Sequence, residues 1–498
     1  MTWQQALIDP QATLREALAA IDQGGVGIAL VVDTDERLVG IIAGLDARRA
    51  MLEGATLDDA VQPFINGDPT VANGDMDDQE LLHLMHTSRH YQIPIIDKNH
   101  QITGLRLMQE LTQGTPLSIP NLGGNEWAYV KDCLDTNYVS SVGGYVDRFE
   151  KQVAEYIGAS HGIACTSGTH ALHTAAIIAG LGPGTEVLLP TLTFIAPVNA
   201  VSYTGTQPIF CDSTHETMGL SPESLSQFLT AHAERGADGR TFNKSTGNQI
   251  VAVIVVHIFG HPVDMDPILQ ICEDYNLCLI EDAAESMAAT YKGRQTGNIG
   301  HIGCLSFNGN KIITTGGGGM VITSNDEMAA RARHLTTQAK SDGFRYEHDE
   351  VGFNYRLSNV LAAIGVAQME QLDEHLEHKR RIFRLYRDAF QRLPDVELFE
   401  EKDWAHSNYW LNTIFVPNET RDILLQRLND HGVMARPLWQ LCHRQPMYAD
   451  CQRTNLDNSE TLHDHGISLP SSIGLTETEI RFIADTVETV LGETTGAR

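Results

Sequence analysis

Between residues 163 and 323, short apolar runs alternate with longer amphipathic segments. The runs are too short for helices and rich in β-branched residues, which indicates buried parallel strands. Helical segments such as Pro267–Tyr275 lie between several of them. This alternation predicts an α/β domain with a mainly parallel sheet. The predicted strands are Ile163–Cys165, Glu186–Pro190, Gln207–Phe210, Ile250–Val256 and Leu277–Ile280.

The remaining C-terminal pattern predicts a smaller α+β region. We expect a large domain over residues 121–380 and a small one over residues 381–498. Residues 236–248 are polar and rich in glycine, so we expect an exposed loop there. Predicted helices are Asp326–Thr337, Asn359–Arg392 (long, charged and broken), Thr420–His431 and one after Thr476, with a strand at Trp410–Val416.

The first 112 residues contain an internal repeat. Each copy reads as an apolar strand, an aspartate, a turn and a second strand with glycine, and a helical segment precedes it. Asp33 stands seven residues before Gly40, and Asp97 stands seven before Gly104. Such a repeat predicts two small α/β units packed as a pseudo-symmetric pair. Residues 113–120, rich in turn formers, predict a linker to the next domain.

Composition narrows the class of protein. The 498 residues suggest roughly three folding units. The net charge of −29 argues against nonspecific binding to nucleic acid or anionic membranes. No apolar run approaches the ~20 residues that span a bilayer, and the N-terminus does not resemble a secretory signal. The eight cysteines form no C-x-x-C pair, so we expect reduced thiols in a cytoplasmic protein.

Two residues suggest the chemistry. Asp282 follows the apolar run Leu277–Ile280, and Lys311 lies in a turn before four glycines. A pyridoxal phosphate enzyme needs a lysine that forms a Schiff base with the cofactor and an acid that keeps the pyridinium nitrogen protonated. Thr193 and Phe194 follow another predicted strand, so they are candidates for the same crevice.

A phosphate site is predicted upstream. Thr166–Thr169 is a small turn with glycine, between the strand Ile163–Cys165 and a helical segment that begins near His170. The N-terminus of a helix offers free N–H groups and the positive end of the helix dipole to an anion. The order of phosphate turn, strand-tip acid and lysine is far more specific than any one of the three.

Histidine pairs and triplets raise the question of a metal, and we expect none. His83, His86 and His90 lie near one helix face, but no acid or cysteine completes a ligand set. We expect His257, His261 and the pair 463/465 to be structural or substrate-lining, because pyridoxal phosphate chemistry needs no metal.

From about residue 119 to the C-terminus, the chain resembles the DegT/DnrJ/EryC1/StrS sugar aminotransferases, which are fold-type I pyridoxal phosphate enzymes. The motifs are Ser167–Leu172, Glu281–Ser286, Ser306–Lys311 and Gly352–Arg356. Two further motifs, Pro120–Trp127 and Asn137–Gly143, are similar to the branch that serves legionaminic acid and bacillosamine pathways. That branch aminates C4 of a UDP-linked 4-keto-6-deoxy-N-acetylglucosamine.

The resemblance assigns roles to individual residues. Lys311 binds the cofactor and shuttles the proton, and its presence rather than a histidine favours amino transfer over dehydration. Asp282 pairs with the pyridinium nitrogen, where burial beside that cation keeps it ionised. Asn354 reaches the phosphate of the other subunit, which implies a homodimer with shared active sites. The remaining cofactor contacts implied are Ser167, Gly168, Thr169, Phe194, Glu285 and Ser306, and the substrate contacts are Ser141 and Arg436.

The repeat in residues 1–112 resembles a pair of CBS modules. In that family, a segment after the second strand contacts the ribose of an adenine nucleotide. The first copy has Asp46 and Arg48 in place but carries Ala43 where a hydroxyl is usual, and the second copy lacks the aspartate. Ligand sensing and a purely structural or dimerising role are therefore both open for this pair.

The resemblance implies a cytoplasmic homodimer that transfers an amino group from L-glutamate to the 4-keto group of a nucleotide-linked deoxysugar. Such a reaction would serve the synthesis of surface polysaccharides or nonulosonic acids. Two other classes stay open. One is a pyridoxal phosphate-dependent nucleotide-sugar dehydratase, and the other is a CBS-regulated binding protein that senses the cofactor.

Overall fold

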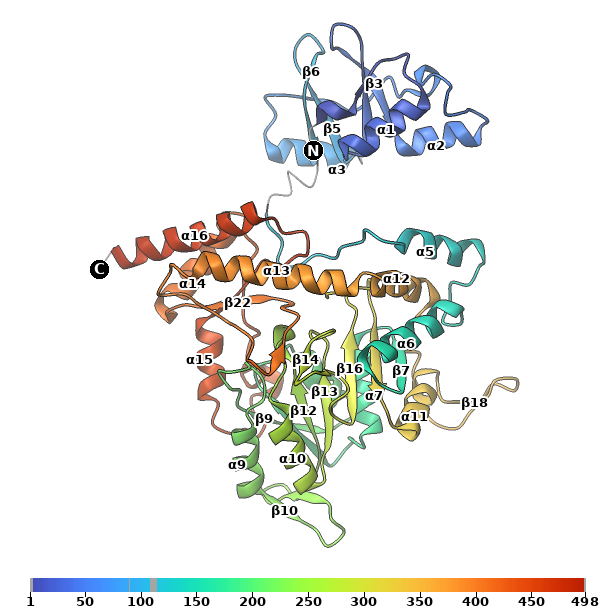
Figure 1. Ribbon diagram of the computed structural model, residues 1–498. Helices are drawn as coiled ribbons and strands as arrows, with labels where there is room; N and C mark the ends of the chain where they lie inside the picture. Colours follow the sequence, from blue (N-terminus) through green and yellow to red (C-terminus); the bar gives the residue numbers. More distant parts are fainter. Residues whose placement is uncertain (1–2, 89, 108–113, 497–498) are drawn as a thin grey trace. The chain divides into compact units, whose positions relative to one another are not determined.

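The computed structural model of the protein describes residues 3–88, 90–107 and 114–496. It divides into two compact units, Met1–Gly114 and Thr115–Arg498, each with its own hydrophobic core (Figure 1). The expected border between residues 112 and 113 lies outside the described residues. The N–H of Thr115 donates to the carbonyl of Gly432 over 2.7 Å, so this part of the expected linker packs within the second unit.

The first unit contains two three-stranded sheets of the same design. In each, a short strand pairs parallel with a longer one, which pairs antiparallel with a third. The internal repeat predicted from the sequence is therefore present in the fold. The elements are β1 (Leu7–Ile8), α1 (Leu14–Gly24), β2 (Ile28–Val32), β3 (Leu38–Ala43), α2 (Gly44–Leu52), β4 (Ala72–Asn73), α3 (Asp78–Ser88), β5 (Gln92–Ile96) and β6 (Ile102–Leu107).

The turns that join β2 to β3 and β5 to β6 are built alike. Asp33 Oδ1 accepts bonds from the N–H groups two and four residues ahead, at 2.9 Å each. Asp97 Oδ1 does the same at 2.8 Å each. The two turns also pair with each other, because Leu38 N donates to His100 O over 3.0 Å and the equivalent N–H of Ile102 donates back over 3.2 Å. These reciprocal bonds relate the two copies by a pseudo-two-fold axis.

The second unit is built on one large mixed sheet. Its hydrogen-bonded path runs β10-β11-β12-β13-β16-β17-β7, with β8 beside β12 and β9 beside β8. The pairs β9–β8, β8–β12, β12–β13 and β13–β16 are parallel, whereas β17 runs antiparallel to both β16 and β7. The strands are β7 (His161–Cys165), β8 (Thr185–Pro190), β9 (Gln207–Cys211), β10 (Ala233–Arg235), β11 (Thr241–Asn243), β12 (Gln249–Val256), β13 (Cys278–Asp282), β16 (Ile302–Ser306) and β17 (Gly319–Thr323).

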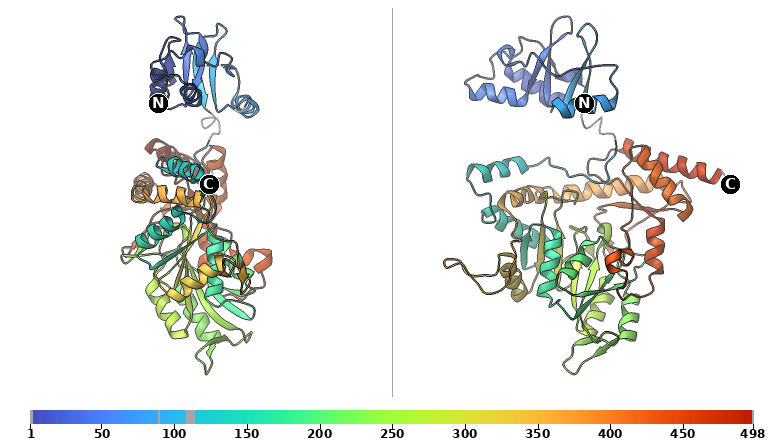
Figure 2. Two further views of the ribbon diagram at one scale, coloured as in Figure 1. Left: turned by 90° about the vertical axis from the view of Figure 1, so that its right-hand side faces the viewer. Right: turned by 180° about the vertical axis from the view of Figure 1, so that it is seen from behind.

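Helices cover both faces of this sheet (Figure 2). Successive side chains of a strand point to opposite faces. Leu189 and Ile254 therefore pack in one core cluster, with residues of α7 and α8, whereas their neighbours Leu188 and Val255 pack in another, with residues of α9 and α10. Because the central strands are buried on both faces, their sequences are continuous apolar runs, and this is why the pattern predicted them. The helices are α5 (Glu126–Asp135), α6 (Gly144–Ile157), α7 (Gly168–Ile178), α8 (Ala196–Tyr203), α9 (Pro222–His232), α10 (Met265–Tyr275) and α11 (Asp326–Thr336).

The long helical segment after residue 358 is broken, as predicted, into α12 (Asn359–Met369) and α13 (Leu372–Phe390). The expected domain border at residue 380 falls inside α13, and Thr115–Arg498 forms one compact unit. A smaller sheet of order β20-β22-β24-β23 follows. Its elements and their neighbours are β20 (Glu397–Leu398), β21 (Ala405–His406), β22 (Asn412–Phe415), α14 (Asn418–Asp430), β23 (Arg436–Pro437), α15 (Asp457–His465), β24 (Gly466–Leu469) and α16 (Glu477–Gly496).

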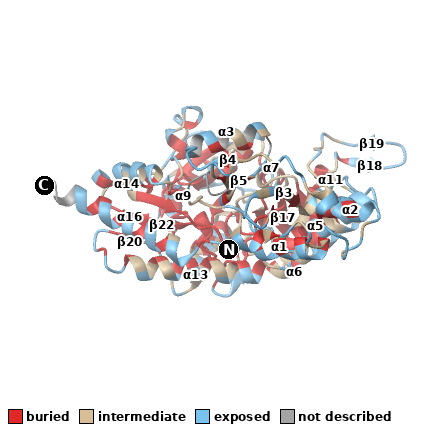
Figure 3. Cartoon of the chain, turned by 90° about the horizontal axis from the view of Figure 1, so that it is seen from above, coloured by how far each residue is buried: buried red, intermediate tan, exposed pale blue. Residues whose placement is uncertain are grey.

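One hairpin replaces a loop that the sequence predicted, and a second hairpin was not predicted. Residues 236–248 do not form a simple exposed loop, because β10 and β11 pair there and Asn243 is buried, donating to Glu186 over 2.8 Å. A run of three residues is too short to show a strand pattern. The pair β18 (Lys340–Asp342) and β19 (Glu347–His348) projects from the unit (Figure 3). Phe344, between these two strands in the sequence, is 93% exposed.

The remaining short elements are the strands β14 (Thr290–Tyr291) and β15 (Arg294–Gln295) and the 3₁₀ turns Trp3–Ala6, Gln62–Phe64, Ile258–Gly260, Cys442–Arg444 and Pro446–Tyr448. Among the residues that the structure describes, no helix combines the length and apolar character needed to cross a bilayer.

Candidate active site

Side chains converge at the carboxyl edge of the large sheet. Because β7, β8, β12, β13 and β16 run in the same direction, the residues that follow them meet at this edge. Asp282 is the last residue of β13, and its carboxylate is buried. One oxygen accepts a bond from the N–H of Ala284 over 3.1 Å. Burial raises the pKa of Asp282 to about 6, and an adjacent cation would lower that pKa again and so favour the ionised carboxylate.

The predicted phosphate turn lies between β7 and α7. Ser167 is the N-cap of α7, and its side chain accepts a bond from the N–H of His170 over 3.1 Å. A side chain at Gly168 would come within 2.9 Å of Cβ of Ser306, at the end of β16. Glycine is therefore required for the start of the helix to approach this strand. The first turn of α7 leaves backbone N–H groups for an anion.

Lys311 lies in the turn between β16 and β17. Its N–H donates to the carbonyl of Asn308 over 3.0 Å, which fixes the turn. Its side chain is 12% exposed, and Nζ lies 3.4 Å from Oε1 of Glu285. The same Nζ is 3.7 Å from the centre of the Trp410 ring, within cation–π range. A carboxylate and an aromatic face thus hold the amine at the cavity.

Glu285 is buried, in the turn three residues beyond Asp282. Its Oε2 accepts a bond from the N–H of Phe259 over 2.8 Å. Burial raises the pKa of Glu285, while the nearby ammonium of Lys311 opposes that rise. Phe259 has a φ of 54°, an unusual conformation for an aromatic residue that persists where the surroundings enforce it. In this conformation the N–H of Phe259 is hydrogen-bonded to the carboxylate of Glu285 in the cavity wall.

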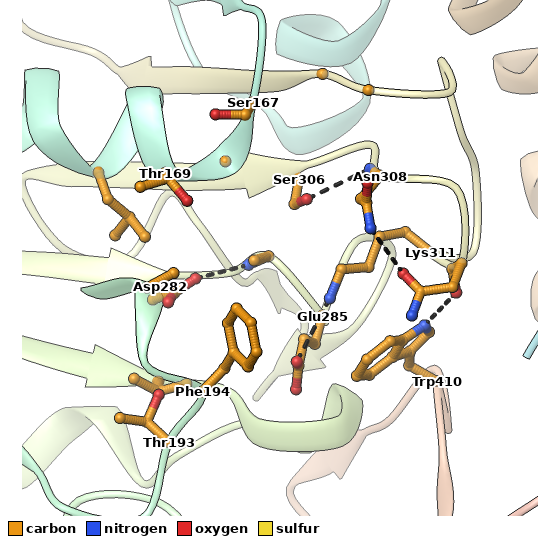
Figure 4. A pocket seen from close by; sticks show the side chains of 18 of the residues that line it. Ser167, Thr169, Thr193, Phe194, Asp282, Glu285, Ser306, Asn308, Lys311 and Trp410 are labelled. Carbon is orange, nitrogen blue, oxygen red and sulfur yellow. Dashed lines mark hydrogen bonds and ion pairs between the residues drawn. The ribbon is translucent and has the colours of Figure 1, made fainter. Parts of the chain in front are cut away.

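These groups surround one cavity of about 260 Å³ (Figure 4). Every cofactor contact implied by the resemblance except Asn354 lines it. Phe194, half-exposed, has its ring centre 5.2 Å from that of Trp439. The lining includes Ser167, Gly168, Thr169, Thr193, Phe194, Asp282, Glu285, Ser306, Asn308, Asn310, Lys311, Gly317, Gly318, Trp410 and Trp439.

Three candidate residues of the second unit do not line this cavity. Asn354 is exposed and pairs through its backbone with Thr337. Arg436, in β23, donates to the carbonyl of Ala435 over 2.7 Å and is exposed. Ser141 lies before α6 and is partly exposed. The contribution of Asn354 to a partner's site and the substrate contacts of Ser141 and Arg436 stay predictions.

The nucleotide residues predicted in the first unit lie at the start of α2. Asp46 Oδ2 accepts a bond from the N–H of Ala43 over 3.0 Å, so it caps the helix. Arg48 is exposed. The capping bond occupies one carboxylate oxygen and leaves the second for a ligand.

Two tryptophans of the cavity wall are not among the residues predicted from the sequence. Trp410 precedes β22 and Trp439 follows β23, and they lie 99 and 128 residues beyond Lys311 in the sequence. Trp410 was expected at the start of a strand, and nothing in a strand pattern indicates that its first side chain faces a distant lysine. A sequence-level signal was absent because tertiary packing alone brings these residues to the site.

Two of the histidines considered for metal binding, His257 and His261, are buried in the second unit. Nε2 of His257 lies 3.0 Å from Glu281, and its Nδ1 accepts the N–H of Val263 over 3.1 Å. His261 is buried between aromatic rings, and burial lowers its pKa to about 3. These contacts are structural. In the first unit, the side chain of His86 lies outside the described residues.

The residues of the cavity fit pyridoxal phosphate. The buried carboxylate of Asp282, with its raised pKa, matches a ring cation. The glycine-dependent approach of α7 to β16 leaves a narrow, N–H-lined place for a phosphate. Lys311 stands at the same cavity and can bond to an aldehyde. Asp282, Lys311, Phe194 and the first residues of α7 would hold the group.

The profile of the DegT/DnrJ/EryC1/StrS aminotransferase family matches residues 120–488, and the CBS domain profile matches residues 1–53. GDP-perosamine synthase of Caulobacter vibrioides is 38% identical over 384 residues, covering 75% of this chain and 98% of the relative. The putative pyridoxal phosphate-dependent aminotransferase EpsN of Bacillus subtilis is 38% identical over 368 residues, covering 73% and 92%. Among solved structures, the aminotransferase TlmJ of Streptoalloteichus hindustanus matches with a TM-score of 0.70 and 25% identity, covering 76% of this chain and 100% of that one.

Proposed function

The chain belongs to the DegT/DnrJ/EryC1/StrS family and is a pyridoxal phosphate-dependent sugar aminotransferase with an N-terminal CBS domain, and we propose that it transfers the amino group of L-glutamate to the 4-keto group of a nucleotide-linked deoxysugar. One observation carries the proposal. Asp282, Lys311 and the N-terminus of α7 come from three distant segments and meet at one cavity.

The chain's own residues would divide the work between them. Pyridoxal phosphate, when bound, supplies an electron sink and carries the amine between donor and acceptor. Asp282 would keep a proton on the ring nitrogen, and the start of α7 would bind the phosphate. The Nζ amine of Lys311 would bond to the aldehyde and would also move a proton to and from the reacting carbon. Phe194 would limit the movement of the bound group.

The acceptor is proposed as a class. The motifs Pro120–Trp127 and Asn137–Gly143 support a UDP-linked 4-keto-6-deoxy-N-acetylglucosamine, and they would connect the enzyme to surface polysaccharide or nonulosonic acid synthesis. The relatives named GDP-perosamine synthase support a GDP-linked sugar instead. The shared chemistry is a 4-keto-6-deoxysugar on a nucleoside diphosphate.

Two features of the assembly belong to the same proposal. The exposed position of Asn354 supports a homodimer in which this residue reaches the partner's cofactor phosphate. The cytoplasm is the proposed location of that dimer. In the first unit, Asp46 and Arg48 would contact an adenine nucleotide and so link amino-sugar output to nucleotide level. Equilibrium dialysis with ATP and AMP, beside Asp46→Ala, tests that contact: loss of binding in the variant supports it, and equal or absent binding in both proteins contradicts it.

The experiment that tests the main proposal supplies ¹⁵N-labelled L-glutamate with UDP-, GDP- and dTDP-linked 4-keto-6-deoxysugars and measures label in the sugar by mass spectrometry. Label in one of these sugars, together with formation of 2-oxoglutarate, is the expected result. Loss of water from a sugar without label would instead indicate a dehydratase. No conversion of any sugar would contradict the proposed acceptor class.

A further inference from the structure

Trp410 is fixed at both backbone groups. Its N–H donates to Oδ1 of Asn408 over 2.8 Å, and the amide of Asn408 in turn donates to the carbonyl of Glu285 over 2.9 Å. The carbonyl of Trp410 accepts a bond from Nζ of Lys379 over 2.9 Å. The residue is only 2% exposed, so these bonds are shielded from water.

The indole ring of Trp410 reaches the lysine turn in two ways. Its Nε1–H donates to the carbonyl of Asn310 over 2.7 Å, directly before Lys311. The same carbonyl accepts a second bond, from the hydroxyl of Ser118 over 3.0 Å. The ring face lies under the amine of Lys311, at 3.7 Å from the ring centre. One side chain therefore fixes both the backbone and the amine of the lysine turn.

Lys379 is a buried amine without a carboxylate partner in the described part of the chain, and burial lowers its pKa to about 7. It lies in α13, is 1% exposed, and donates to the carbonyls of Trp410 and Ser471. A buried lysine destabilises the folded state unless its N–H groups are hydrogen-bonded. An apolar side chain at the same position would be more favourable for stability. None of the proposed chemistry uses this amine. Its contact with the Trp410 carbonyl connects Lys379 to the cavity wall.

We propose that Trp410 positions Lys311 while an amino donor has displaced it from the cofactor, and that Lys379 acts as a positioning residue through the Trp410 carbonyl. This inference rests on the proposed function. A displaced lysine must stay within reach of the carbon whose proton it moves. A small shift of its amine from that position lowers the rate of proton transfer considerably. The indole face and Glu285 offer its amine one defined place between proton transfers.

Single-turnover kinetics of the donor half-reaction separate positioning from donor binding. Trp410→Phe keeps an aromatic face but loses the indole N–H, and Trp410→Leu loses both. We expect the rate at saturating L-glutamate to fall about 10-fold in the first and about 100-fold in the second. Lys379→Met should lower it about 10-fold. The glutamate concentration for half-saturation should change less than about twofold in all three.

The matched control is Trp404→Phe. Trp404 packs on Tyr291, with ring centres 5.1 Å apart, and does not line the cavity. This variant makes the same chemical change at a partly buried tryptophan away from the cavity and should keep the wild-type rate. An equal loss of rate in Trp404→Phe would show that packing alone explains the effect and would overturn the proposal. The proposal would also be overturned if a higher half-saturating glutamate concentration explained the whole loss of rate in the Trp410 variants.

A second readout does not depend on turnover. Cofactor-free protein is mixed with pyridoxal phosphate, the lysine–cofactor bond is reduced with borohydride at timed intervals, and labelled Lys311 is measured by peptide mass spectrometry. We expect labelling to be about 10-fold slower in Trp410→Leu than in wild type and unchanged in Trp404→Phe. A folded Trp410→Leu that labels and reacts like wild type overturns the inference. A wild type that labels at Lys311 but ignores every amino donor overturns the proposed function instead.

Discussion

The amine of Lys311 and the carboxylate of Glu285 lie 3.4 Å apart, and the second carboxylate oxygen of Glu285 binds the N–H of Phe259 at 2.8 Å. One acid therefore holds both the lysine and a conformationally unusual loop. The chemistry and the shape of this wall of the cavity depend on the same side chain.

Two substitutions of Glu285 test its contact with the N–H of Phe259. Glu285→Gln keeps an acceptor for Phe259, so we expect stability to change by less than about 1 kcal/mol. Glu285→Ala leaves that buried N–H unpaired and should destabilise the protein by about 1–3 kcal/mol. Urea unfolding of the cofactor-free proteins measures both. Equal destabilisation in the two variants would show that the bond to Phe259 does not matter.

The buried Asp282 predicts an unusual pH dependence of the cofactor-free protein. Its folded-state pKa, about 6, lies above the ordinary 3.8, so the folded state binds the extra proton between these values. This group's contribution to stability is therefore fully present below about pH 4 and lost as pH rises through about 6. At pH 7.5 we expect Asp282→Asn to be more stable than wild type by about 1–3 kcal/mol.

The measurement is urea unfolding of both cofactor-free proteins from pH 4.5 to 7.5. The advantage of Asp282→Asn should grow with pH, whereas the variant should bind pyridoxal phosphate more weakly and lose about 100-fold or more in rate. A stability difference that does not vary with pH would contradict the burial of a strained carboxyl at this position.

Gly168→Ala tests the approach of α7 to β16. Its Cβ would lie 2.9 Å from Cβ of Ser306, so the helix start must shift. We expect pyridoxal phosphate affinity to fall about 10- to 100-fold, because the phosphate N–H groups move with it. Gly182→Ala is the matched control, since a Cβ there meets nothing within 4 Å. Fluorescence titration with the cofactor gives the comparison, and equal affinities in the two variants would refute the tight approach.

The pseudo-symmetric turns of the first unit predict matched mutational effects. Asp33→Ala and Asp97→Ala each remove an oxygen that accepts two backbone N–H bonds. Each change should destabilise the first unit by about 1 kcal/mol, and the two values should agree within about 0.5 kcal/mol. Thermal unfolding monitored by circular dichroism measures them. A large loss at one turn and none at the other would show that the two copies are not equivalent in energy.

The sequence predicted those parts of the site that follow a strand or begin a helix. Local sequence patterns indicate Asp282, Lys311 and the turn before α7. A buried strand precedes Asp282, a run of glycines follows Lys311, and a helix begins directly after the turn. Trp410 carries no such signal, since its contact with Lys311 arises only when the smaller sheet packs against the larger one. The hairpin of β10 and β11 was missed for another reason: runs of three residues show no period.

The visible spectrum of the purified protein, before and after L-glutamate and beside Lys311→Ala, tests the central claim most directly. The account predicts a yellow wild-type protein whose lysine–cofactor absorbance disappears when glutamate is added, and a variant that lacks this absorbance from the start. A yellow protein that does not respond to glutamate would contradict the donor assignment. A protein that takes up no pyridoxal phosphate, or a Lys311→Ala variant with the same spectrum as wild type, would contradict the account of the site itself.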